Sequence, residues 1–158
     1  MTFKDLQDDL INEITEILKD VVTTNANGEV VTGIKGYAHA LPIVQSNDED
    51  PEQYFPYFIV RFDEGRTRDD DDCWHVATDI IIGVHDMALH GGHEHILIAI
   101  QRIADRFAWD PQLDHKYRAD QDIRWAVGED DTYPHYFGAL GITFSTPKIG
   151  RKADYDYA

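Results

Sequence analysis

Apolar and polar residues between Cys73 and Trp109 follow two different periods in succession. Residues 75–85 alternate, so that one face of an extended strand carries Val76, Thr78, Ile80, Ile82 and Val84. From His93 onward the apolar residues recur at steps of three and four, which places them on one stripe of a helix: Ile96, Leu97, Ile100, Ile103, Ala104 and Phe107. The pattern therefore predicts one strand followed by one helix, and the rest of the chain must cover their apolar sides.

The same two periods predict one more helix and three more strands. Residues 3–21 carry apolar side chains at helical spacing, and Thr2 can cap this helix. Alternating aromatic and β-branched residues predict strands at 54–62, 123–127 and 136–145. Residues 29–44 are interrupted by glycine and proline, which predicts a short edge strand or an irregular arm.

The order of elements is helix, strand pair, helix, strand pair. This order predicts the α+β class, with a mainly antiparallel sheet of about four strands and two helices packed on one face. A hairpin with a long charged turn is the simplest connection between 54–62 and 75–85. The length of 158 residues predicts a single domain over residues 1–150, and residues 151–158, which have no apolar face, predict a flexible C-terminal tail.

The chain is strongly acidic, with 30 Asp and Glu against 14 Lys and Arg and a formal net charge of -16. Such a charge disfavours attraction to nucleic acid phosphates and to anionic membranes. Cys73 is the only cysteine, so no intrachain disulfide can form. The N-terminus lacks the pattern of a signal peptide, and no apolar run approaches the length of a membrane span. These features predict a protein of cytosolic origin that binds neither membranes nor a specific nucleic acid sequence.

The histidine-rich stretch 85–95 is the most enzyme-like feature, because imidazole and carboxylate groups are ligands for zinc and iron. A small metal-dependent enzyme would use His85, Asp86, His90, His93 and His95. Their spacing matches no metal signature, and the pair Gly91-Gly92 fits a turn into the helix. The chain also has no nucleophile elbow, no phosphate-binding glycine loop and no HExxH motif. We expect no catalytic residue, metal or cofactor, and keep the metal-dependent enzyme as an alternative.

Two further features bear on the kind of function. Four consecutive aspartates, Asp69–Asp72, could bind a cation, but a run of this kind is typical of a solvated loop. An acidic protein that mimics DNA is another alternative, although its carboxylates should line one surface, whereas here they concentrate in loops. More aromatic residues occur than one sheet face needs, namely Tyr57, Trp125, Tyr133, His135, Tyr136 and Phe137. Aromatic residues are enriched where proteins meet, which favours a protein that assembles.

Three stretches of the chain together resemble the tail terminator and tail-completion family of tailed bacteriophages. They are residues 54–61, residues 80–86 before the second helix, and residues 133–138 before a strand that leads to 145–149. The resemblance implies a structural virion protein without enzymatic activity. Such a protein forms a ring, typically of six copies, at the head-proximal end of the tail. It stops polymerisation of the tail tube and joins the tail to the head.

The resemblance also implies partners and a location. The partners would be further copies of the chain, the tail tube protein and the head–tail connector protein, with DNA passing through an acidic lumen. The location would be the virion tail, and the host cytoplasm during assembly. The clusters His90–His95 and Asp69–Asp72 are not features of the family. Another connector or neck protein of the same virion is an alternative that composition does not separate from a terminator.

A terminator has to act through surface contacts, and two charged segments are our candidates for them. The first is the turn between the two strands of the expected hairpin, and the second is the C-terminal tail. The residues predicted to make contacts are Asp63, Arg66, Arg68, Asp70, Asp72, Arg151, Tyr155 and Tyr157.

Overall fold

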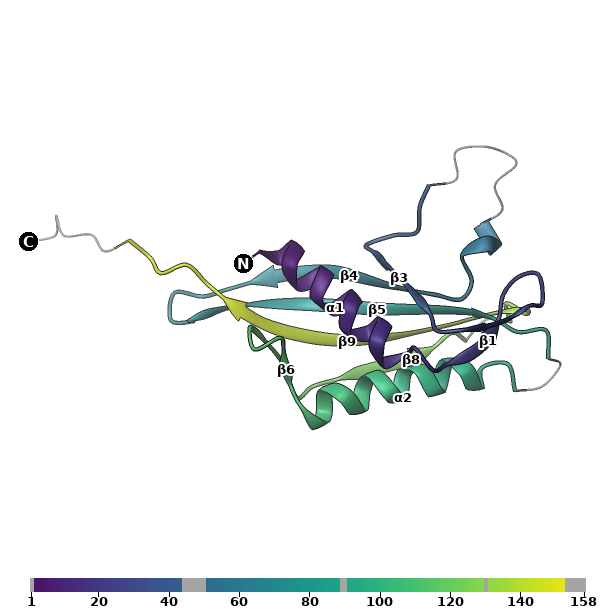
Figure 1. Cartoon of the computed structure of the whole chain (residues 1–158). Helices are drawn as coiled ribbons and strands as arrows, with labels where there is room; N and C mark the ends of the chain where they lie inside the picture. The colour runs from purple at the N-terminus through teal and green to yellow at the C-terminus, as the bar shows by residue number, and fades with distance from the viewer. Residues whose placement is uncertain (1, 44–50, 89–90, 130, 153–158) are drawn as a thin grey trace, which may run out of the picture.

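The computed structural model of the chain describes residues 2–43, 51–88, 91–129 and 131–152. It has two α-helices against one face of a β-sheet (Figure 1). The helices are α1 (Phe3–Ile17) and α2 (Glu94–Trp109), and a short 3-10 helix, η1, spans Pro51–Tyr54. The long strands are β4 (Tyr57–Arg66), β5 (Cys73–His85) and β9 (His135–Pro147). The short strands are β1 (Val22–Thr24), β2 (Val30–Thr32), β3 (Lys35–Ala38), β6 (Gln112–Leu113), β7 (Tyr117–Ala119) and β8 (Arg124–Val127).

The pairing of β5 with β9 forms the centre of the sheet. These strands are antiparallel over thirteen positions, from Cys73 opposite Pro147 to His85 opposite His135. On its other side β5 pairs antiparallel with β4, which in turn pairs parallel with β3. The β1–β2 hairpin joins the end of β5 through Thr24 opposite His85. Both β7 and β8 pair with the outer edge of β9, and β6 pairs with β7.

The prediction of about four strands is wrong, because the sheet has nine strands in the part of the chain that the structure describes. The α+β class stands, and β4, β5, β8 and β9 correspond to the four expected strands. The five additional strands are two to four residues long. Of these, β2 and β3 lie within residues 29–44, for which the sequence predicts a short edge strand or an irregular arm. The other three, β1, β6 and β7, have only two or three residues, which is too short to display an alternating pattern.

Both helices bury their apolar stripes against one face of the sheet. In β5 and β9 the even-numbered side chains point toward the helices, so Ile80 and Leu140 lie side by side in the core. Across from them lie Leu10 and Ile14 of α1 and other apolar residues of the two helices. Thr2 caps α1 through a reciprocal capping box with Asp5, as the sequence predicts. Neither described helix is long and apolar enough to cross a membrane.

The opposite face of the sheet, which we call the open face, carries the odd-numbered side chains of β5 and β9. No described α-helix packs on it. At one end an aromatic group covers it, in which Phe55 stacks on His135 at 4.5 Å between ring centres and also contacts Tyr57 and Phe137. Most of its central side chains, such as Ala77 and Thr143, are half-buried and small.

Two glycines of β9 test this one-sided arrangement. A Cβ atom at Gly138 would lie 2.4 Å from Ile96 Cγ2 in α2, whereas one at Gly141 would meet only Asp79 Oδ1, at 3.7 Å. We expect Gly138→Ala to lower the free energy of unfolding by about 1–3 kcal/mol, because the helix must shift. The matched variant Gly141→Ala should change it by less than about 0.5 kcal/mol. Chemical denaturation measures both, and equal effects would contradict a helix layer on one face only.

Candidate functional site: the hairpin tip and the open face

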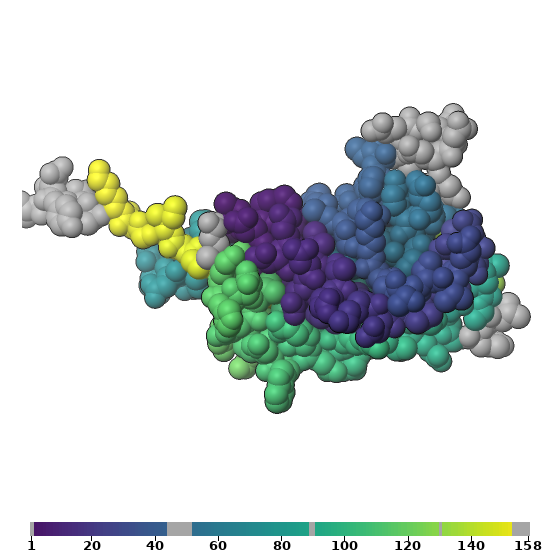
Figure 2. Space-filling model, viewed as in Figure 1, coloured from purple at the N-terminus to yellow at the C-terminus, as the bar shows by residue number. Residues whose placement is uncertain are grey.

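The turn between β4 and β5, residues 67–72, forms a projecting hairpin tip. It lies at the same end of the molecule as the last residues of β9 and the chain that follows them (Figure 1). Figure 2 shows both segments extending past the helix layer. The register of β5 and β9 explains this, since Cys73 at the start of β5 pairs with Pro147 at the end of β9. The hairpin tip and the described start of the predicted tail, residues 151–152, are therefore neighbours.

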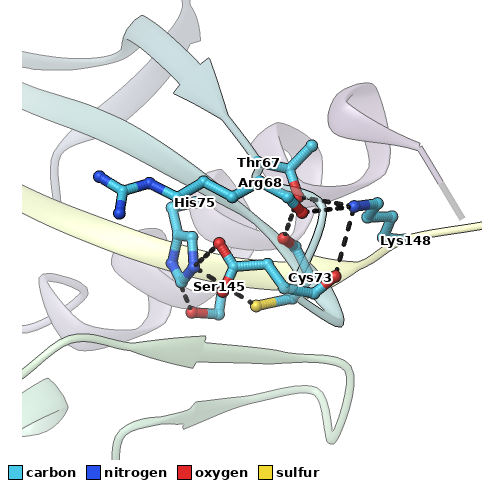
Figure 3. Close-up of polar contacts among 7 residues, drawn as sticks. Thr67, Arg68, Cys73, His75, Ser145 and Lys148 are labelled. Atoms are coloured by element: carbon cyan, nitrogen blue, oxygen red, sulfur yellow. Dashed lines mark hydrogen bonds and ion pairs between the residues drawn. The ribbon is translucent and has the colours of Figure 1, made fainter.

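Lys148 holds the hairpin tip in place (Figure 3). Its ammonium group donates to Thr67 Oγ1 at 3.1 Å and to the backbone carbonyls of Arg68 at 2.9 Å and Asp71 at 3.3 Å. The Thr67 hydroxyl in turn donates to the carbonyl of Cys73 at 2.8 Å, which closes the turn. Hydrogen bonds from a charged donor are stronger than those between neutral groups, so a loop that would otherwise be solvated is braced by the chain after β9.

A second group of contacts ties the tip to the open face. His75 Nε2 lies 3.5 Å from Asp71 Oδ2 and 3.7 Å from Cys73 Sγ, and His75 Nδ1 lies 3.3 Å from the hydroxyl of Ser145. Serine, histidine and aspartate in series also occur in hydrolases. Here Ser145 sits within a strand that is paired on both sides, with His75 and with Arg118, rather than at the sharp turn that presents a nucleophile. The arrangement therefore braces the base of the tip.

The predicted contact residues divide between the tip and the strands. Asp70 and Asp72 are exposed at the tip, and neither makes an ion pair with another residue that the structure describes. Arg68 contributes its carbonyl to Lys148. Arg151 lies 3.5 Å from Asp69, but both side chains are at least 85% exposed, so this pair contributes little to stability. Tyr155 and Tyr157 lie outside the described residues.

Asp63 and Arg66 belong to β4 rather than to the turn. Asp63 sits at a bulge, where the register of β4 against β5 shifts between Phe62 and Glu64. Arg66 pairs with Glu64 at 3.0 Å. The prediction placed these two residues in a connecting loop, and the structure instead places them within the strand, because β4 continues four residues beyond the expected end.

Arginines flank the open face on both sides, a feature that the sequence did not reveal. One row across the sheet runs Arg61, Asp79, Gly141, Arg124, and a second runs Arg66, His75, Ser145, Arg118. We call the open face between and including these two rows the arginine face. The Nε of Arg61 donates to the His39 carbonyl at 3.1 Å, which fixes one of the four arginines. Only the pairing of the strands, and not the pattern along any one strand, brings these residues together.

Asp79 lies at the centre of the arginine face beside Asp63. Burial and the neighbouring Asp63 carboxyl raise the pKa of Asp79 from 3.8 to about 6, while Arg61 and Arg124 act in the opposite direction. A carboxyl with this pKa is partly protonated just below neutral pH. The charge of the open face therefore depends on pH in a range where an ordinary aspartate is fully ionised.

The histidine-rich stretch does not form one group in the described part of the chain. His85 is buried at the end of β5, with its ring centre 5.4 Å from that of His135. His95 instead lies 3.2 Å from Asp86, and Asp86 Oδ1 also accepts a hydrogen bond from the amide of Ala88. Among the residues that the structure describes, no group of three or more His, Cys, Asp or Glu side chains could hold a metal ion. His90, which belonged to the alternative metal site, lies outside the described residues.

Comparison with known proteins finds no protein-family model that matches the chain and no curated protein whose sequence matches it. The resemblance to phage tail terminators therefore remains a prediction. The two features of the structure that bear on function are the braced hairpin tip and the arginine face.

The bracing of the tip by Lys148 is testable by hydrogen exchange. We expect Lys148→Met to speed exchange of the amides in residues 67–73, because three hydrogen bonds to the turn are lost. The free energy of unfolding should fall by only about 1–2 kcal/mol. Lys152→Met, an exposed position four residues further on, is the matched control and should leave the exchange unchanged. Unchanged exchange in Lys148→Met would show that the tip holds its shape without this residue.

The raised pKa of Asp79 predicts a pH-dependent stability. Its proton binds more tightly in the folded chain, so its contribution to stability is fully present below pH 3.8 and is lost as the pH rises through about 6. Asp79→Asn should therefore be more stable than the parent above pH 6, by about 1 kcal/mol after allowance for solvent screening. The difference should vanish near pH 4. Denaturation from pH 4 to 8 measures it, and a difference independent of pH would contradict the assignment.

Proposed function

We propose that this chain is a tail terminator, a structural protein of a bacteriophage virion that forms a closed ring at the head-proximal end of the tail. The single observation that carries the proposal is the braced, projecting hairpin tip next to a sheet face that no described α-helix covers. In a heterologous contact two different surfaces meet, and here the projecting tip of one copy would meet the open face of the next copy. Such contacts give a ring when the rotation between copies closes, and a filament when it does not.

Two further properties support the proposal. The residues that resemble the terminator family, 54–61, 80–86 and 133–138, overlap the start of β4, the end of β5 and the start of β9, which pair with one another at the end of the sheet opposite the hairpin tip. The net charge of -16 suits a ring through which DNA has to pass without binding. The partners would be further copies of the chain, the tail tube protein and the head–tail connector protein.

Assembly and tube capping test the proposed function directly. The purified chain should form particles of about six times its mass of 18.1 kDa, either alone or on meeting tail tubes of the same virus. Added to growing tubes, it should bind at one end and stop elongation, as seen by negative-stain microscopy and by tube length. A protein that stays monomeric at every concentration and ignores tube ends is not a terminator.

A parallel measurement addresses the metal-dependent alternative. Stoichiometric zinc, iron or manganese in the purified protein, with a turnover that alanine at His93 and His95 abolishes, would favour an enzyme instead. Of these two positions His95 is the more informative one to replace, because its side chain contacts Asp86, which also belongs to the alternative metal site.

A further inference from the structure

The hairpin tip carries acidic groups that the described chain leaves unbalanced. Lys148 donates its three hydrogen bonds to Thr67 Oγ1 and two backbone carbonyls, and among the described residues Arg151 pairs with Asp69 alone. Asp70 and Asp72 remain exposed, with no ion pair to any residue within the described ranges. The tip is therefore a braced projection with two uncompensated carboxylates. Its shape does not have to form on contact, which lowers the entropic cost of binding.

The outer edge of the arginine face carries two exposed arginines. Arg118 in β7 and Arg124 in β8 are exposed, and neither makes an ion pair with a residue that the structure describes. On the inner edge Arg61 and Arg66 already contact His39 and Glu64. The link between β7 and β8 adds Asp120 and Asp122, so the edge is not positive as a whole. Any contact there would depend on local pairing with the two arginines.

The dimensions of the arginine face suit a hairpin turn. From β4 to β8 it spans three strand spacings, roughly 14 Å, whereas the two strands of a hairpin lie about 4.8 Å apart. The floor between the arginines consists of small side chains, such as Ala77, Gly141 and Thr143, together with the carboxyl of Asp79. At one end Asp72 and Arg118 of the same copy line a cavity of about 350 Å³ without an ion pair between them, which leaves room for a further group.

We propose that the arginine face of one copy receives the hairpin tip of the next copy, with Asp70 and Asp72 pairing with Arg118 and Arg124. The occupant is a second copy of this chain, because the chain itself supplies a braced acidic projection and a face with two exposed arginines on which no described α-helix packs. The contact is head-to-tail, and a closed ring follows if its rotation closes. This inference rests on the proposed function, since it names the surfaces that meet within the proposed ring.

Charge reversal in two separate proteins tests the pairing. The tip variant is Asp70→Lys/Asp72→Lys, and the face variant is Arg118→Glu/Arg124→Glu. Each alone should weaken assembly by about tenfold or more, because like charges then meet. Mixing the two in equal amounts should restore assembly, since every lysine tip then finds a glutamate face. Mass photometry measures the assembled fraction, and circular dichroism confirms that each variant is folded.

Matched controls carry reversals on the helix side of the molecule. Arg102→Glu in α2 and Asp20→Lys after α1 both change exposed residues away from the open face. They should change assembly by less than about twofold, because exposed charges remote from a contact contribute little.

The outcomes separate this inference from the proposed function. Rings that form normally with either reversal, or variants that fail and are not rescued by mixing, overturn the pairing and leave the terminator proposal standing. A parent protein that never assembles, with or without tail tubes, overturns both. Assembly that stops at a dimer contradicts the head-to-tail arrangement, since it indicates a two-fold contact.

Discussion

The antiparallel pairing of β5 with β9 is the interaction on which the rest of this structure depends. Thirteen consecutive positions are in register, and the even-numbered side chains of both strands meet the helices. Because side chains alternate along a strand, burying one set leaves the other set on the opposite face. The same register brings the start of β5 next to the end of β9, and so brings the turn before β5 next to the chain that leaves β9. One pairing thus creates both the open face and the braced tip.

The charged residues also differ between the helix side of the sheet and the open face. On the helix side several carboxylates are compensated within the chain, as Glu13 is by Arg106 at 2.6 Å. On the open face arginines end two rows of residues across the sheet, and Asp79 and Asp63 share a site between them. Two carboxyls so placed oppose each other when both are ionised, which costs stability near neutral pH. Such a face, on which no described α-helix packs, is suited to a charged partner, and we propose the acidic tip of another copy as that partner.

Sequence patterns predicted the long helices and strands, and they missed the features that depend on which strands pair with one another. The alternation of residues 75–85 and the helical spacing from Ile96 to Phe107 are confirmed by β5 and α2, and Thr2 caps α1 as expected. β1, β6 and β7 were missed because two or three residues cannot display a period, whereas β2 and β3 were predicted only as a short edge strand or an irregular arm at 29–44. The arginine face was missed because alternation tells which residues of one strand share a face, but not which strands are neighbours. Lys148 gave no signal in the sequence, since its three partners lie about 80 residues away.

We propose that copies of this chain meet through the open face of the sheet. Arginine-specific chemical labelling, read by mass spectrometry in free and assembled protein, tests it most directly. If copies meet through this face, Arg118 and Arg124 become protected on assembly while Arg102, on the exposed side of α2, labels equally in both states. Protection of Arg102 with unchanged labelling of Arg118 and Arg124 would contradict the account, because the copies would then meet through their helices.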